Sequence, residues 1–249
     1  MSAPRTFVIG DLHGCAIELD RLLDAISPGP ADTVCCLGDY IDRGPDARGV
    51  VQRLIQLREE CPRCVFLKGN HEDMFLDFLG YAGRYGEAFL WNGGEATLAS
   101  YGLLGRSPAD VAARLPIAHR DFLLGLQSRA EFPGFLCVHA GLRPTRPLEE
   151  QDEEDLLWIR QDFLAVPHPF SFTVLFGHTP QRDVLLDLPY KIGLDTGVVY
   201  GNQLSCLELE RAELWQIGRG ADRVRRRSLA EALGAHSRRP LDSGCSNQS

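Results

Sequence analysis

The sequence contains no long hydrophobic run, and no apolar stretch approaches the roughly 18 residues needed to span a membrane. Residues 1–5 lead straight into the first apolar segment, without the hydrophobic region of a secretory signal. We therefore expect a cytoplasmic protein without a membrane partner. With 249 residues, 44% of them hydrophobic, the chain is large enough to build a sizeable α/β core.

Positive charge is scarce outside the C-terminal tail. The formal net charge is −8, although residues 219–249 hold seven arginines against three acidic residues. This tail therefore carries +4, which leaves −12 on residues 1–218. The negative charge of residues 1–218 argues against duplex nucleic acid as a partner. It does not exclude a phosphate ester as substrate, because bound metal ions can reverse the local electric field.

The eight cysteines lack the spacing of a zinc-binding domain. Cys61 and Cys64 form a CxxC pair, but no second CxxC and no paired histidine accompanies them. We expect the cysteines of apolar segments to be small buried hydrophobes in a reducing compartment. A redox role or a structural zinc site at Cys61 and Cys64 are the alternatives.

Three apolar segments each stop at a glycine and are followed directly by polar side chains. These segments alternate with two stretches of helical periodicity, and the β-α-β-α-β order predicts neighbouring parallel strands. Ligands bind at the carboxyl edge of such sheets. The predicted strands are residues 5–10, 33–38 and 64–69, and the predicted helices are residues 16–26 and 45–59. The polar residues at the edge are Asp11, His13, Asp39, Asp42, Arg43, Asn70 and His71.

A mostly helical insertion follows the third predicted strand, over residues 72–133. Within it, Trp91 and Asn92 precede two glycines and a further helical stretch. We expect a tight turn with Trp91 in the core. The alternative is that the glycines let the backbone approach a ligand.

The second half of the chain predicts further strands, two of which end in histidine, at His139 and His178. Turn signals between the later, shorter segments favour a second, mixed or antiparallel sheet. Residues 219–249 are expected to form a basic, mobile tail, apart from a short helix at 228–233. The predicted strands are residues 134–138, 172–177, 191–197, 204–209 and 213–217.

The residues at the strand ends form a donor set for metal ions. Two carboxylates, three imidazoles and one amide suit borderline ions such as Mn²⁺, Fe or Zn²⁺. Six donors are too many for one ion with an open position, but they suit two ions about 3.5–4 Å apart. Asp39 would bridge the ions, because its strand is predicted to lie between the other two. The six residues are Asp11, His13, Asp39, Asn70, His139 and His178.

The same cluster predicts phosphoester hydrolysis. Two ions would clamp a phosphate and lower the pKa of a bound water towards about 7, so that this water attacks phosphorus in line. His71 would protonate the leaving alkoxide as general acid, and Asp42 would orient its imidazole. Phosphate oxygens would be held by Arg43, Arg160 and Asn70. Each residue alone is compatible with a structural role, but the joint occurrence of five clusters favours a metal centre.

Five motifs, in this order, resemble those of the PPP-type calcineurin-like metallophosphoesterases. The resemblance implies a four-layer αββα sandwich of two mixed β-sheets with a dinuclear metal site, often loaded with Mn²⁺. Residues 1–218 would then form one catalytic domain, with residues 72–133 as an insertion or cap. The motifs are Gly10–Gly14, Gly38–Gly44, Gly69–Glu72, His139–Gly141 and Gly177–Thr179.

Within that family the chain looks most like the small bacterial and phage serine/threonine protein phosphatases. The resemblance assigns metal binding to the same six residues and proton transfer to His71 with Asp42. It assigns phosphate binding to Arg43 and Arg160. The large eukaryotic members carry a further tyrosine motif near the metals, for which the sequence shows no counterpart; residues 195–197 occupy that region.

The expected function is therefore the hydrolysis of phosphoserine and phosphothreonine in proteins. The alternative is hydrolysis of dinucleoside polyphosphates such as diadenosine tetraphosphate, which needs an adenosine pocket built from the insertion. A metal-dependent binding protein without turnover would lack a ligand or the acid, and none is missing here. The expected partner is a phosphoprotein or a small phosphoester, and the sequence carries no signal for an oligomeric state.

Overall fold

The N-terminal part of the chain forms the predicted β-α-β-α-β unit. In the computed structural model, which describes residues 3–236, β1 pairs parallel with β2, and β2 pairs parallel with β3. The elements are β1 (Thr6–Ile9), α1 (Ala16–Ile26), β2 (Thr33–Cys36), α2 (Ala47–Glu60) and β3 (Val65–Phe66). Most apolar side chains of α1 and α2 recur at helical spacing and are buried beneath the sheet, whereas Ile17 is exposed.

Three later strands extend this first sheet on the other side of β1. They are β9 (Gln203–Glu208), β10 (Glu213–Gly218) and β11 (Arg225–Ser228), all antiparallel to their neighbours. The order β11-β10-β9-β1-β2-β3 places β2 between β1 and β3, as the sequence predicted. The prediction that residues 204–209 and 213–217 join the second sheet was wrong. Instead β9, buried along its whole length, covers the edge of β1 that would otherwise stay unpaired.

The second sheet has the order β4-β5-β6-β8-β7 and is also mixed. β5 and β6 correspond to the predicted strands that end before the two histidines. β4 and β7 were not predicted, because they are short and only partly buried, so they show no strong apolar pattern. The strands are β4 (Arg129–Phe132), β5 (Phe135–Val138), β6 (Thr173–Phe176), β7 (Leu185–Asp187) and β8 (Lys191–Gly193).

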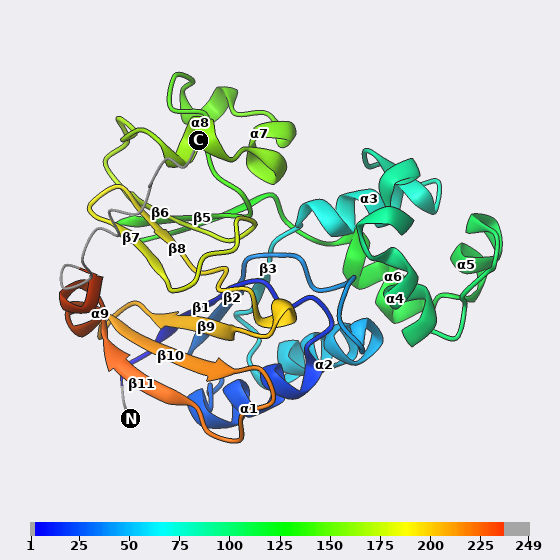
Figure 1. The fold of residues 1–249 in the computed structure, drawn as a ribbon, viewed down its shortest axis with the longest axis horizontal. Helices are drawn as coiled ribbons and strands as arrows, with labels where there is room; N and C mark the ends of the chain where they lie inside the picture. Colours follow the sequence, from blue (N-terminus) through cyan, green and yellow to red (C-terminus); the bar gives the residue numbers. More distant parts are fainter. Residues whose placement is uncertain (1–2, 237–249) are drawn as a thin grey trace, which may run out of the picture.

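The two sheets pack face to face, with helices on their outer sides (Figure 1). Val8 and Cys35 of the first sheet share an apolar cluster with Cys137 and Leu175 of the second. Helices α1 and α2 cover the outer face of the first sheet, and α7 (Glu153–Trp158) and α8 (Gln161–Leu164) lie beyond the second. The predicted αββα architecture of two mixed sheets is therefore confirmed. None of the described helices is long and apolar enough to cross a membrane.

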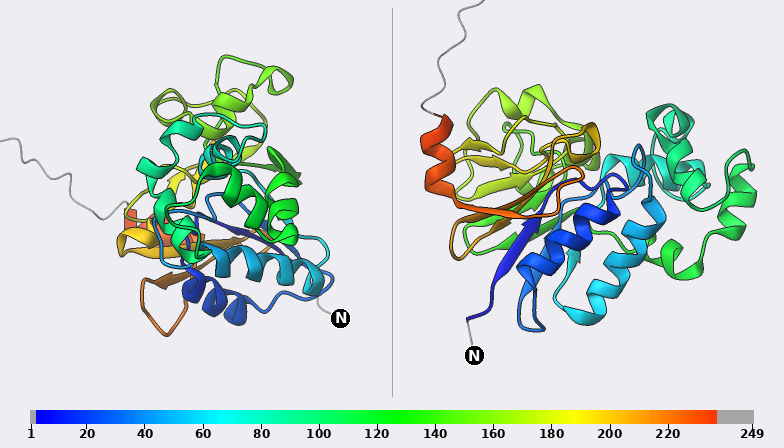
Figure 2. Two further views of the ribbon diagram at one scale, coloured as in Figure 1. Left: turned by 90° about the vertical axis from the view of Figure 1, so that its right-hand side faces the viewer. Right: turned by 60° about the horizontal axis from the view of Figure 1, so that its bottom comes forward.

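The helical insertion lies to one side of the sheets (Figure 2). Its helices α4 and α6 pack on α2, and Phe89 stacks between Phe75 and Phe78, with ring centroids 4.9 Å from each. Its elements are α3 (Asn70–Phe78), the 3₁₀ turns η1 (Gly86–Ala88) and η2 (Leu90–Asn92), α4 (Gly94–Ser100), α5 (Pro108–Arg114) and α6 (Ile117–Leu124). The stretch predicted as insertion also contains β4, which belongs to the second sheet.

The described part of the tail contains more secondary structure than the sequence predicted. Residues 225–228 form the edge strand β11, and α9 (Leu229–His236) follows it, which overlaps the short helix predicted at 228–233. The arginines of β11 are held by neighbouring side chains: Arg226 pairs with Glu213, and Arg227 pairs with Asp183. The structure thus adds a strand at 225–228 to the helix that the sequence predicted, and residues 237–249 of the predicted tail lie outside the described part of the chain.

The described cysteines are free thiols. Cys61 is buried and Cys64 half-buried, at the end of α2 and the start of β3, where burial raises the pKa of both thiols. Neither belongs to a metal-ligating group within residues 3–236.

Gly10 lies where the end of β1 meets the end of β8. A Cβ at this position would lie 2.4 Å from the Leu194 carbonyl oxygen and 2.8 Å from its carbon. We therefore expect Gly10→Ala to lower the free energy of unfolding by about 1–3 kcal/mol, because backbone must move to admit the methyl group. Gly218→Ala is the control, since its nearest atom would be the Ala221 Cβ at 3.6 Å. Equal urea midpoints for the two variants would contradict this close approach.

Candidate metal centre

Several non-glycine residues at the strand ends adopt left-handed backbone conformations. This region is uncommon for such residues and is strained by about 1–3 kcal/mol in its sparsely populated parts. These residues are His13 (φ 40°), Asp39 (51°), Asp42 (69°), Arg43 (66°) and His178 (64°). Each was predicted from the sequence as a site residue, so the strain coincides with the predicted centre.

Glu72 holds the loop that carries Asp39. Its buried carboxylate accepts hydrogen bonds from the backbone N–H groups of Asp39 (2.9 Å), Tyr40 (2.8 Å) and Gly69 (2.9 Å). The loop after β2 is thereby tied to the first turn of α3. The sequence analysis assigned no role to Glu72. A glutamate three residues after a helix N-cap is nevertheless a capping signal, and Glu72 holds this position after Gly69.

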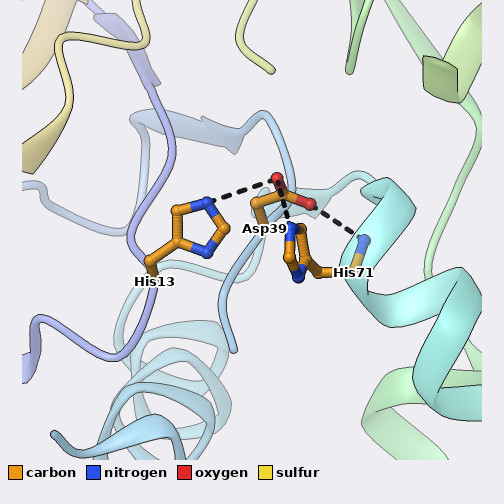
Figure 3. A group of neighbouring side chains, drawn as sticks. All are labelled: His13, Asp39 and His71. Carbon is orange, nitrogen blue, oxygen red and sulfur yellow. Dashed lines mark hydrogen bonds and ion pairs between the residues drawn. The ribbon is translucent and has the colours of Figure 1, made fainter. Parts of the chain in front are cut away.

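The Asp39 carboxylate lies at the middle of the cluster (Figure 3). Its Oδ2 lies 3.5 Å from His13 Nε2. Its Oδ1 lies 3.4 Å from His139 Nε2 and accepts the backbone N–H of His71 at 3.1 Å. Burial alone would raise the pKa of Asp39, but the surrounding histidines, His139 first, lower it below its usual range whenever one of them is protonated, and His71 is the one whose own pKa is raised. Asp39 is therefore an anion shared by its histidine neighbours.

Two histidines present nitrogen lone pairs to this anion. His13 Nδ1 lies 2.8 Å from the Ile41 carbonyl oxygen, and His139 Nδ1 lies 2.8 Å from that of Leu37. A carbonyl only accepts, so each Nδ1 carries the proton and each Nε2 turns a lone pair towards Asp39. Burial lowers the pKa of both imidazoles, that of His13 to about 3, so they stay neutral. His13 Nε2 also accepts from Arg43, whereas His139 Nε2 faces the oxygens of Asp39 and Asn70, an arrangement of acceptors that a cation would stabilise.

Asn70, His178 and Asp11 complete the cluster. Asn70 Oδ1 lies 2.9 Å from His139 Nε2 and 2.8 Å from His178 Nδ1, and the backbone N–H of His178 donates to Asp11 Oδ2 at 2.9 Å. Asp11 Oδ1 and His178 Nε2 are buried with no hydrogen-bond partner among the described residues. Buried polar atoms are rarely left unpaired, so these two fit the ligands of an ion.

The donors converge into two groups that share Asp39. Asp39 with His139 and His178 forms one group, and Asp39 with His13 and His71 forms the other; the donor atoms of each lie within 4.8 Å of one another. Carboxylate, amide and imidazole donors together fit divalent transition ions. The second group includes His71, which was predicted as the general acid and not as a ligand. Asp11 and Asn70 belong to neither group but contact His178, so that all six predicted ligand residues are buried and linked, with Asp39 shared by both groups.

His71 also belongs to a hydrogen-bonded chain that leads away from this cluster. Its Nδ1 lies 2.6 Å from Asp42 Oδ2, and the Thr97 hydroxyl donates to Asp42 Oδ1 at 2.6 Å. Burial would lower the pKa of His71, but the charges of Asp39 and Asp42 raise it. Thr97 was not foreseen, because it lies on α4 of the insertion, 55 residues from Asp42.

The two predicted phosphate-binding arginines lie beside the cluster. Arg43 Nη1 donates to His13 Nε2 at 2.7 Å, and its guanidinium lies 5.7 Å from the centroid of the Tyr200 ring. Arg160 Nη1 donates to the His178 carbonyl oxygen (3.1 Å) and lies 3.2 Å from the Thr179 hydroxyl. The sequence showed no tyrosine near the metals, but the structure places Tyr200, 60% exposed, next to Arg43.

The Trp91 turn lies against Arg43 rather than in the core. The Arg43 backbone N–H donates to the Gly93 carbonyl at 3.1 Å, and a Cβ on Gly93 would lie 2.7 Å from Arg43 Cγ. Trp91 is 94% exposed, so the expectation of a buried indole was wrong. The glycine instead allows the insertion to pack closely beside the centre, with the indole in solvent nearby.

The sequence and the fold both match known phosphoesterases. The family model described as calcineurin-like phosphoesterase matches residues 4–208. A solved structure described as that of a candidate diadenosine tetraphosphatase superposes with a TM-score of 0.68 at 25% identity, covering 87% of this chain and 94% of its own.

Two curated relatives carry different names. The serine/threonine-protein phosphatase 1 of Salmonella typhimurium is 30% identical over 213 residues, which cover 82% of this chain and 91% of the relative. The asymmetrical bis(5'-nucleosyl)-tetraphosphatase PrpE of Oceanobacillus iheyensis is 26% identical over 235 residues, with 83% and 89% covered. The cluster of histidines and aspartates, the αββα fold and the family match agree, and the chain belongs to the calcineurin-like phosphoesterase family.

Proposed function

We propose that this chain hydrolyses phosphomonoesters with two divalent metal ions, most favourably Mn²⁺, and that its substrates are phosphoserine and phosphothreonine in proteins. The observation that carries the proposal is the buried His71–Asp42 pair, 2.6 Å apart, directly beside the anion Asp39. A pure metal-binding site needs no such pair. A hydrolase that must protonate a poor alkoxide leaving group does.

The metal ions would be held by the six predicted ligand residues, with Asp39 shared between the His13 side and the His139 side, whereas His71 would stay free to carry a proton. When bound, the ions would polarise the phosphoryl group and supply the activated water. Asn70 Oδ1 faces two imidazoles, so its amide Nδ2 would be the group that donates to a phosphate oxygen. Arg43 and Arg160 are placed to grip the remaining oxygens through their forked N–H groups.

His71 would carry the proton that the leaving group needs. Its Nδ1–H donates to Asp42, which fixes the ring and leaves Nε2 to hold a second proton. Because the neighbouring carboxylates raise the pKa of His71, the imidazolium persists towards neutral pH. Transfer of the Nε2 proton to the alkoxide oxygen would release the free serine or threonine hydroxyl and leave a neutral imidazole.

Hydrolysis of dinucleoside polyphosphates is the second candidate, and the exposed rings of Trp91 and Tyr200 favour it. Aromatic faces stack on nucleobases. The Tyr200 ring lies 5.7 Å from the Arg43 guanidinium, and Trp91 lies two residues before Gly93, whose carbonyl accepts the Arg43 N–H. The tetraphosphatase relatives support the same candidate.

A side-by-side assay separates the two candidates. We expect chain stripped of metal and reloaded with Mn²⁺ to release phosphate faster from a phosphoserine peptide than it cleaves diadenosine tetraphosphate. We also expect Trp91→Ala to leave peptide hydrolysis within about twofold of wild type, because a peptide needs no base stacking. Faster cleavage of the nucleotide, lost about tenfold or more in Trp91→Ala, would overturn the protein-phosphatase proposal in favour of the second candidate.

The general acid is tested by His71→Asn, which leaves Asp39 and the other donors in place. We expect its kcat on a phosphoserine peptide to fall by about 10²–10⁴-fold. The loss should be much smaller on p-nitrophenyl phosphate, because its leaving group departs without a proton. An equal loss on both substrates, or no loss, would contradict the assignment.

Thr97 is expected to act through Asp42. Thr97→Val keeps the shape but cannot bond the carboxylate, and we expect kcat to fall about tenfold with KM little changed. Thr97→Ser should restore the rate. In the His71→Asn background the Thr97→Val change should cost nothing further, and an additional tenfold loss there would show that Thr97 acts independently of His71.

A further inference from the structure

Asp195 is a buried acidic residue that lies beside the centre and has no assigned role. It follows β8 of the second sheet, as Asp11 follows β1 of the first. The two strand ends touch at Gly10, where a Cβ would lie 2.4 Å from the Leu194 oxygen and 3.3 Å from the Asp195 nitrogen. The Asp195 backbone therefore lies beside Gly10, the residue before Asp11, and the two carboxylates are near enough to interact electrostatically.

Both carboxylates keep an oxygen without a partner. Asp195 is 3% exposed; its Oδ1 accepts the Gly197 N–H at 2.9 Å, whereas its Oδ2 is buried and unpaired within residues 3–236. Asp11 Oδ1 is buried and unpaired in the same way. Two neighbouring anionic groups with unsatisfied oxygens repel each other, and burial makes this repulsion costly. A bound cation would offset the repulsion between the carboxylates and give the unpaired oxygens a partner.

The backbone around Asp195 is held firmly in this position. The Thr196 hydroxyl bonds the Gln203 carbonyl oxygen at 2.6 Å and the Ser205 hydroxyl at 2.7 Å, and Ser205 in turn accepts from Gln216 at 2.8 Å. This buried polar network joins the loop after β8 to β9 and β10 of the first sheet. The backbone that follows Asp195 is therefore fixed, and the Gly197 N–H holds the Asp195 carboxylate against it.

We propose that Asp195 belongs to the metal centre as a seventh protein group, whose carboxylate strengthens the binding of a divalent cation on the Asp11 side. The inference rests on the metal-dependent hydrolysis proposed above and extends it to a residue outside the five sequence motifs. Arg43 and Arg160 lie near enough to act on the charge of Asp195, but neither is hydrogen-bonded to it, so the nearby arginines leave its Oδ2 available.

The test is Asp195→Asn, which keeps the size of the side chain and an oxygen acceptor for Gly197. Chain stripped of metal by a chelator is titrated with Mn²⁺ by calorimetry, well below the melting temperature of each variant. We expect the dissociation constant of at least one Mn²⁺ to rise about 10–100-fold. The melting temperature of the metal-free variant should not fall, because the substitution removes a repulsion. Asp195→Ser replaces Asp195→Asn if the latter does not fold.

Glu131→Gln is the matched control, since it removes one negative charge from an exposed position on β4. It should leave the Mn²⁺ dissociation constant unchanged. A wild-type affinity in Asp195→Asn would overturn the Asp195 proposal alone. A wild-type chain that binds no Mn²⁺ would overturn both this proposal and the proposed function.

Discussion

The buried charge of Asp39 is the constraint on which the rest of the site depends. A carboxylate removed from water is costly unless charges and hydrogen bonds surround it. Here the His71 N–H donates to it, three imidazoles lie within 4.0 Å of its oxygens, and Glu72 secures the loop that carries it. Asp39 lies at the end of β2, between β1 and β3, and is therefore within reach of the ligands that follow both neighbouring strands.

The second sheet supplies histidines of the cluster that the first sheet does not contain. His139 and His178 follow β5 and β6 of the second sheet, and they reach Asp39 and Asn70 only because the two sheets pack together through Val8, Leu175 and their neighbours. The same packing brings Gly10, the residue before Asp11, against the backbone of Leu194 and Asp195. Left-handed conformations at the strand ends cost stability, and they persist because the surrounding hydrogen bonds and the apolar core outweigh that cost.

The residues of the site can be predicted from the sequence more readily than the residues that surround and support them. Asp11, Asp39 and Asn70 are visible because each follows an apolar run that stops at glycine, and a parallel unit must bring such ends together. Thr97 and Asp195 carry no local signal, since their roles arise from contacts between distant segments. The same limit applies to β9, whose apolar pattern shows a strand but not which sheet it joins. Trp91 was placed in the core because indoles usually lie there, whereas its turn leaves it in solvent.

Anomalous diffraction from crystals grown with Mn²⁺, measured on both sides of the manganese absorption edge, would locate the metal ions. We expect two peaks, one on each side of the Asp39 carboxylate, with His13 beside one and His139 and His178 beside the other. No peak at this cluster, or a single peak that does not touch Asp39, would contradict the claim that Asp39 organises a two-metal phosphoesterase centre.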